Sequence, residues 1–189
     1  MKHSNQLDRK VFVLTLCFGL AVLRWARTVA SSIVVDMNLE DLVSKSDSII
    51  QGVVESVSSQ WDSEKKLIFT YATIRVDDPL KGERRRTLQI RQMGGQVGAL
   101  VLSVPGMPEF NEGASVIVFL KDAGNGTFHV VGLNQGRYVI EEDFATANIS
   151  GVDLVSPKTG LVTGASIVRR VGLEEFKAQI RELVAGMDR

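Results

Sequence analysis

The sequence contains few of the residues that most catalytic and metal sites require. Its 189 residues include two histidines, His3 and His129, and one cysteine, Cys17. A zinc site needs three or four nitrogen, sulfur or carboxylate ligands, so a histidine without a second one does not support a metal centre. A Ser-His-Asp triad would depend on His129, and no G-x-S-x-G motif accompanies it. We therefore expect neither a cofactor nor a bound metal.

The sequence also lacks an apolar run long enough to span a bilayer. The uncharged run at residues 11–23 has 13 residues, whereas a spanning helix needs about 20. It follows a basic, polar start and precedes small residues at 28–31, an arrangement typical of an export signal. We predict that residues 1–30 are a signal peptide, cleaved between Ala30 and Ser31, and that the protein is periplasmic or secreted. An uncleaved N-terminal membrane anchor is the alternative.

Removal of this segment would change the chemistry of the chain. Cys17 lies inside the apolar run after Leu16, which is not the small residue that precedes an acylated cysteine in bacterial lipoproteins. The processed chain would hold no cysteine, which excludes disulfides and thiolate catalysis. Its formal net charge would fall from 0 to about −4, because residues 1–30 hold five basic residues and one acidic residue. This charge disfavours nucleic acid as a partner, and no stable membrane insertion is expected after cleavage.

Residues 31–189 have the length of one domain, and the pattern after its start is mainly β. A short helix is predicted near residue 40, because Asn38 can cap it and Asp41 completes a capping box. The stretches 48–61 and 67–76 predict an antiparallel hairpin, followed by a connection at 77–86 that contains Pro79 and Gly82. Further strand patterns lie at 87–93, 99–104, 115–121, 127–133 and 136–142, and the Asn125-Gly126 pair predicts a hairpin turn between the third and fourth of these. So many short strands without intervening helices favour an antiparallel barrel or sandwich.

The C-terminal part of the sequence has a different pattern. Residues 153–164 predict a small hairpin or loop, and residues 173–186 predict an amphipathic helix that ends near Gly186. The apolar face of this helix would contain Leu173, Phe176, Ile180, Leu183 and Val184. We expect this face to pack against the barrel.

The opening of the domain resembles a known family. The segment LEDLVSKSDSIIQGVVESV followed by IRVDDPLKGE is similar to the start of netrin-like domains, which include the tissue inhibitors of metalloproteinases. It also resembles a group of uncharacterised exported bacterial proteins with a cysteine-free version of this pattern. The resemblance covers about residues 38–141 and implies an OB-like, antiparallel Greek-key β-barrel with a short N-terminal helix. The C-terminal hairpin and helix at 150–187 are expected from the residue pattern alone. No inhibitory residue transfers, because those inhibitors use an N-terminal cysteine and this chain has Ser31 at the predicted terminus.

A glycine-rich stretch is the most distinctive loop in the sequence. Gly94, Gly95 and Gly98 precede a β-like run, whereas a phosphate-binding loop requires a following helix. We expect these glycines to supply positive φ angles or close backbone approach where a strand bends. Together with Pro105 and Pro108 they form the predicted partner-binding loop.

Two function classes follow from these patterns. The first is an exported, non-enzymatic binding protein whose protein partner is a secreted protease or an envelope component. The alternative is an exported hydrolase that acts on sugars or peptides through a convergent pair among Asp77, Asp78, Glu141, Glu142 and Asp143. A cleft that contains two of these carboxylates would favour the hydrolase. The sequence leaves the oligomeric state open.

Overall fold

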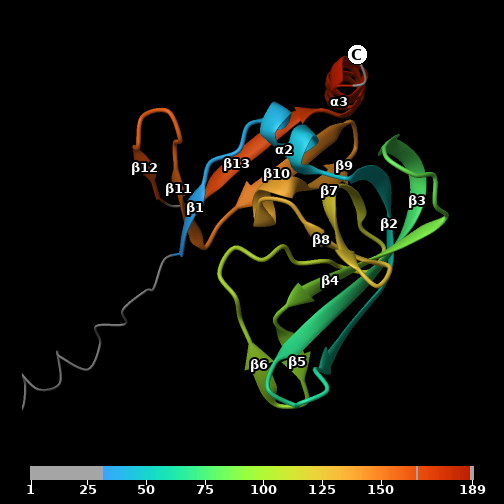
Figure 1. Cartoon of the computed structure of the whole chain (residues 1–189), viewed down its shortest axis with the longest axis vertical. Helices are drawn as coiled ribbons and strands as arrows, with labels where there is room; N and C mark the ends of the chain where they lie inside the picture. The colour runs from blue at the N-terminus through green and yellow to red at the C-terminus, as the bar shows by residue number, and fades with distance from the viewer. Residues whose placement is uncertain (1–31, 165, 188–189) are drawn as a thin grey trace, which may run out of the picture. The chain divides into compact units, whose positions relative to one another are not determined.

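The computed structural model describes residues 32–164 and 166–187, so the predicted signal peptide and its cleavage site lie outside the described residues. In this part the chain is mainly β with two α-helices, α2 (Leu39–Lys45) and α3 (Leu173–Met187) (Figure 1). The predictions of a mainly β fold, a short first helix and a C-terminal helix are confirmed. No helix within the described ranges is long and apolar enough to cross a membrane.

Most strands belong to one sheet with the order β13-β10-β9-β7-β2-β3-β4-β8. Its members are β2 (Ser48–Trp61), β3 (Ile68–Lys81), β4 (Thr87–Met93), β7 (Ser115–Gly124), β8 (Thr127–Val130), β9 (Arg137–Glu141), β10 (Phe144–Ile149) and β13 (Ile167–Gly172). A smaller sheet contains β1 (Ser32–Val35), β11 (Val152–Val155) and β12 (Val162–Thr163). The strands β5 (Gly95–Val97) and β6 (Leu100–Leu102) form a separate hairpin, and the 3-10 helix η1 spans Leu133–Gly136.

Five strands of the large sheet form a ring of hydrogen-bonded neighbours. The strand β8 pairs in parallel with β4 and antiparallel with β7, which closes the cycle β7, β2, β3, β4 and β8. Closure is uneven, because β4 and β8 share only two residue pairs, Gln89 with Thr127 and Ile90 with Phe128. Asn125 and Gly126 have φ angles of 54° and 75° in the turn between β7 and β8, which confirms the predicted Asn-Gly hairpin.

The strand β7 separates two hydrophobic cores. Val116, Val118 and Leu120 belong to the ring core, whereas Ile117 and Phe119 belong to a second core that includes residues of both helices, the helix core. Side chains alternate between the two faces of a strand, so covering both faces buries every residue from 116 to 120. This explains why the sequence here is a continuous apolar run.

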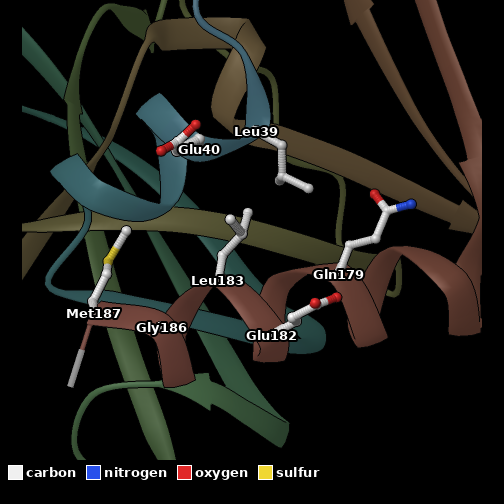
Figure 2. Close-up of a pocket in the computed structure, with 7 residues that line it drawn as sticks. All are labelled: Leu39, Glu40, Gln179, Glu182, Leu183, Gly186 and Met187. Carbon is white, nitrogen blue, oxygen red and sulfur yellow. The ribbon is translucent and has the colours of Figure 1, made fainter. Parts of the chain in front are cut away.

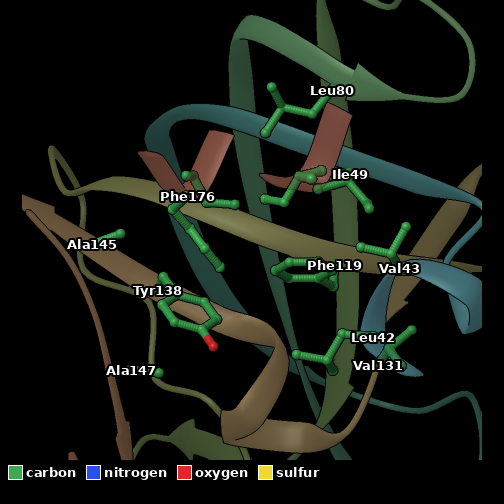
Figure 3. Close-up of a cluster of buried hydrophobic side chains, with 12 residues drawn as sticks. Leu42, Val43, Ile49, Leu80, Phe119, Val131, Tyr138, Ala145, Ala147 and Phe176 are labelled. Carbon is green, nitrogen blue, oxygen red and sulfur yellow. The ribbon is translucent and has the colours of Figure 1, made fainter. Parts of the chain in front are cut away.

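The helix core is built around three aromatic rings (Figure 3). The ring centroid of Phe119 lies 6.1 Å from that of Tyr138 and 6.2 Å from that of Phe176, and the Tyr138 and Phe176 centroids are 4.5 Å apart. The helix α2 begins with the predicted capping box, in which Asp41 N–H donates to Asn38 Oδ1 at 2.8 Å. All five predicted apolar residues of α3 lie in or against this core, as expected.

Ion pairs also hold α3 against the sheet. Asp78 Oδ2 lies 2.8 Å from Lys177 Nζ and 2.7 Å from Arg181 Nη2. Burial raises the pKa of Asp78, but the hydrogen bonds from Lys177 and Arg181 outweigh this effect and leave the pKa below its ordinary value. Asp78 therefore stays ionised and anchors the helix to β3.

The start of the described chain is tied to the fold by one buried glutamine. The backbone N–H of Met37 donates to Gln135 Oε1 at 2.8 Å, and Gln135 Nε2 donates to the carbonyl oxygen of Val35 at 3.0 Å. Gln135 is almost completely buried, so both bonds are shielded from water. Arg169 also donates to the carbonyl oxygen of Met37 at 2.9 Å. The strand β1 pairs in parallel with β11 beside these contacts.

Several boundaries differ from the sequence prediction. The predicted connection at 77–86 is wrong in its first half, because β3 continues through Pro79 to Lys81. Proline has no N–H to donate, so in a sheet it is found at edges and bulges. Pro79 fits this rule, because its pairing with Ile50 lies next to a register shift, where the regular hydrogen-bond ladder is interrupted. The C-terminal helix was predicted to end near Gly186, and α3 extends one residue further, to Met187, the last described residue. The strands β1, β10 and β13 were not predicted.

Candidate functional site

A groove of about 490 Å³ lies at one end of the ring, between the ends of β2, β3 and β4 and the segment 94–111. We call it the mouth groove. The hairpin β5–β6 lies at this end of the molecule, beside the far end of the β2–β3 hairpin (Figure 1). The groove therefore combines strand residues of the ring with the glycine-rich loop.

The floor of the mouth groove is a row of three polar side chains on neighbouring strands. Ser59 of β2 is the register partner of Thr70 of β3, and Thr70 is the register partner of Gln92 of β4. Thr70 and Gln92 lie two residues from Ala72 and Ile90, which belong to the ring core. Because residues two apart in a strand share a face, this polar row is the last layer of the ring interior.

The floor is connected to the loop above it by short hydrogen bonds. The Ser59 and Thr70 hydroxyl oxygens are 2.9 Å apart, and Thr70 Oγ1 donates to the carbonyl oxygen of Gly94 at 2.7 Å. Gln92 Nε2 donates to the carbonyl oxygen of Pro108 at 2.6 Å. Gln92 Oε1 is buried and has no hydrogen-bond partner in the described part of the chain. A buried acceptor without a donor is unusual in native proteins and is a candidate ligand contact.

The glycines adopt the conformations that the sequence predicted. Gly94 and Gly95 have φ angles of 107° and 129°. A Cβ atom on Gly95 would lie 2.3 Å from both Ser59 Oγ and Thr70 Oγ1, so only glycine fits above the floor. Gly98, with φ of 61°, lies in the turn between β5 and β6, where an added Cβ atom would meet nothing within 4 Å. Positive φ angles and close approach are thus confirmed.

The walls of the groove combine apolar side chains with polar ones, and the polar ones are Gln96, Ser103, Glu109 and Asn111. The apolar ones include Val57, Leu102, Met107 and Phe110, together with Val101, whose side chain is 67% exposed. Glu109 is the one charged residue among the described residues that line the groove. An arginine lies behind the wall, because the Arg137 guanidinium carbon is 5.7 Å from the centroid of the Phe110 ring. Burial lowers the pKa of Arg137, and the nearby Glu109 carboxylate opposes this shift.

The structure places three of the five predicted loop residues in the groove. Gly94, Gly95 and Pro108 line it, whereas Gly98 lies in the β5–β6 turn and Pro105 is exposed outside the groove. That the loop binds a partner stays a prediction. Sequence reasoning missed the floor residues Ser59, Thr70 and Gln92. Their signal was present, since polar side chains occupy positions in the alternation that point into the ring.

A second groove, the helix groove, lies between α2 and α3 and has a volume of about 870 Å³. Figure 2 shows Leu183 and Met187 of α3 pointing toward α2, with Leu39 opposite them. Glu40 and Glu182 add carboxylates to its rim. Its surface thus combines exposed apolar side chains with negative charge.

The candidate catalytic residues do not meet in either groove. Neither lining contains any of the five carboxylates at 77, 78, 141, 142 and 143. Asp77 pairs with Arg75, and Glu142, with φ of 54°, lies in the tight turn between β9 and β10. His129 is exposed on β8, between two residues of the ring core. Within the ranges described, no three histidine or acidic side chains are grouped to hold a metal.

Comparison with protein-family models finds no match to this chain, and comparison with curated protein sequences finds none either. The resemblance to netrin-like domains therefore stays a hypothesis that depends on the sequence pattern. The function must be argued from the chemistry of the grooves.

Proposed function

We propose that this chain is an exported, non-enzymatic binding protein, and that a partner protein docks in the mouth groove. The observation that carries the proposal is the groove itself, in which a polar floor and a few polar wall residues lie among apolar side chains under the glycine-rich loop. Pockets that recognise ligands combine an apolar lining with a few fixed polar groups. A secreted protease and an envelope component are the candidate partners.

The proposed fold of the ring is an OB-like barrel of the netrin-like kind. Its support is the pairing pattern, in which three antiparallel strands are followed by a parallel contact between β4 and β8 and an antiparallel contact between β8 and β7. OB-type barrels bind their ligands on the strand faces and connecting loops rather than in a catalytic cleft common to the fold. This supports binding but does not identify the partner.

A matched pair of surface variants tests the docking site. Val101 on β6 and Val168 on β13 are similarly exposed, at 67% and 61%, and only Val101 lines the mouth groove. We expect Val101→Asp to abolish copurification of a defined partner from the exported fraction, because a carboxylate would be buried in the interface. Val168→Asp should retain the same partner. Equal recovery with both variants would contradict docking in the mouth groove.

Export has its own test. The first described strand begins at Ser32, and Edman sequencing of the protein from the periplasmic or secreted fraction gives its true N-terminus. The proposal predicts Ser31 as the first residue. Recovery of the chain with Met1 still present, in the membrane fraction, would favour the N-terminal anchor.

A further inference from the structure

The hydrogen atoms of the groove floor can be assigned from the contacts alone. A carbonyl oxygen only accepts, so the 2.7 Å contact between Thr70 Oγ1 and the Gly94 carbonyl uses the single hydroxyl hydrogen of Thr70. The 2.9 Å contact between Ser59 and Thr70 must then use the hydrogen of Ser59. Every hydroxyl donor of the floor is therefore occupied.

The groups in the floor that are still free to form hydrogen bonds are mainly acceptors. Ser59 Oγ keeps unused lone pairs, and Gln92 Oε1 is an acceptor without a donor. Gln92 Nε2 donates one of its two hydrogens to the carbonyl oxygen of Pro108 at 2.6 Å. The floor thus offers mainly hydrogen-bond acceptors to a ligand, and the second Gln92 amide hydrogen is its remaining side-chain donor.

The charges around the groove disfavour charged ligands. No lysine or arginine is found among the described residues that line it, so a phosphate or carboxylate would have no cation to bind. A cation is also disfavoured, because it would lose its hydration and gain only neutral acceptors in the floor. The one carboxylate of the lining, Glu109, lies on the exposed rim and not in the floor. Phe110 is only 7% exposed, which leaves little aromatic surface for a sugar ring to stack on.

We infer that the mouth groove recognises an uncharged amide N–H of an extended peptide segment, with an apolar side chain of that segment against Leu102 and Met107. The inference rests on the proposed function, since it names the chemistry of the partner at the same site. This amide N–H would donate to Gln92 Oε1, and Ser59 Oγ, which lies on the other side of β3, would accept from a second N–H of the same segment. Because Gln92 Oε1 is covered, binding includes a small outward shift of the segment that ends at Pro108.

Three small probes of similar shape test the inference by NMR titration of the ¹⁵N-labelled protein as it is isolated from cells. Benzamide carries amide donors, N,N-dimethylbenzamide lacks them, and benzoate replaces the amide by an anion. We expect benzamide to shift the backbone resonances of Ser59, Thr70 and Gln92, with a dissociation constant on the order of millimolar. Its affinity should exceed that of the other two by about fivefold or more, which corresponds to one hydrogen bond.

Two glutamine variants test whether the floor causes the preference for benzamide. Gln92→Met removes the unpaired acceptor and should abolish the preference for benzamide over N,N-dimethylbenzamide. Gln96→Met is the control, because Gln96 also lines the groove but bonds through its amide to the Gly98 carbonyl at 3.0 Å. The control should keep the preference, and the dispersion of each spectrum reports whether the variant is folded.

Several results would overturn the inference. They are equal binding of the three probes to the natural protein, no shift with any of them, and shifts at the floor with methyl glucoside but not with benzamide. The copurification test with Val101→Asp is independent of the probes. Loss of partner capture together with failed probes would reject the amide chemistry and keep the site. Working probes with unchanged capture would reject the proposed function and keep the chemistry.

Discussion

The mouth groove and the helix groove differ in a way that their volumes do not reveal. The helix groove is the larger, at about 870 Å³ against about 490 Å³ for the mouth groove. Its walls are the exposed sides of two helices, whereas the floor of the mouth groove is a row of side chains fixed by the pairing of three strands. Fixed polar groups select a ligand, and volume alone does not. This difference is why we propose the smaller groove as the recognition site.

The cores beneath the two grooves also differ in their composition. Below the helix groove lies a core of three packed aromatic rings closed by two helices, whereas the ring interior changes from apolar layers to polar side chains at its mouth. One side is suited to stability and the other to binding. Variants that change one property and leave the other intact test this division.

The largest expected effect is on the helix side. Phe119 is fully buried between Tyr138 and Phe176, so Phe119→Ala should lower the free energy of unfolding by about 3–5 kcal/mol. Phe144→Ala is the control, since Phe144 is 37% exposed and should cost about 1 kcal/mol or less. Urea denaturation followed by far-UV circular dichroism gives both values. Similar losses for the two variants would show that the helix core does not dominate stability.

A pair of glycines sharpens the comparison at the mouth. Gly95→Ala should cost about 2 kcal/mol or more, because its Cβ would meet the Ser59 and Thr70 hydroxyls at 2.3 Å and its φ is 129°. Gly98→Ala has a positive φ but open space around its Cβ, so about 1 kcal/mol is expected. Thermal or urea denaturation measures both. A Gly98 variant as unstable as the Gly95 variant would contradict the close contact of Gly95 with the floor.

The smallest effect is electrostatic and depends on pH. The pKa of Asp78 is below its ordinary value of 3.8, so its stabilising effect is complete above that pH and is lost as the pH falls through the lower folded value. Asp78→Asn should therefore cost about 1 kcal/mol near neutral pH and close to nothing in strong acid. Glu182→Gln is the control, because Glu182 is an exposed carboxylate of α3, the helix that Asp78 of β3 anchors. A cost that does not change with pH would mean that Asp78 acts through packing rather than charge.

Much of the fold was visible in the sequence because the local signals agree with the packing. The capping box of Asn38 and Asp41, the hairpin turn at Asn125 and the apolar face of α3 all lie where they were predicted. The strand β10 was missed because Ala145 and Ala147 have weak strand preference. Both are completely buried in the helix core, so tertiary packing rather than local preference determines this strand.

Only the loop of the candidate site was predicted from the sequence, and its floor was not, for a similar reason. The cluster of glycines indicates positive φ angles or close backbone approach. Gly94 and Gly95 have positive φ angles, and Gly95 lies close to the groove floor. Ser59, Thr70 and Gln92 are ordinary surface residue types, and only the register of β2, β3 and β4 brings them into one row. The register between β2 and β3 shifts at several bulges, and the local alternation of polar and apolar residues does not encode these shifts.

Site-specific photocrosslinking in the living cell tests the central claim most directly. A photoreactive amino acid would replace Val101 in the mouth groove or, in a second strain, Met187 in the helix groove, and both positions are accessible, at 67% and 43% exposed. Illumination should yield one defined protein adduct from position 101 and none from position 187. An adduct from position 187 with none from position 101 would contradict the assignment of recognition to the mouth groove.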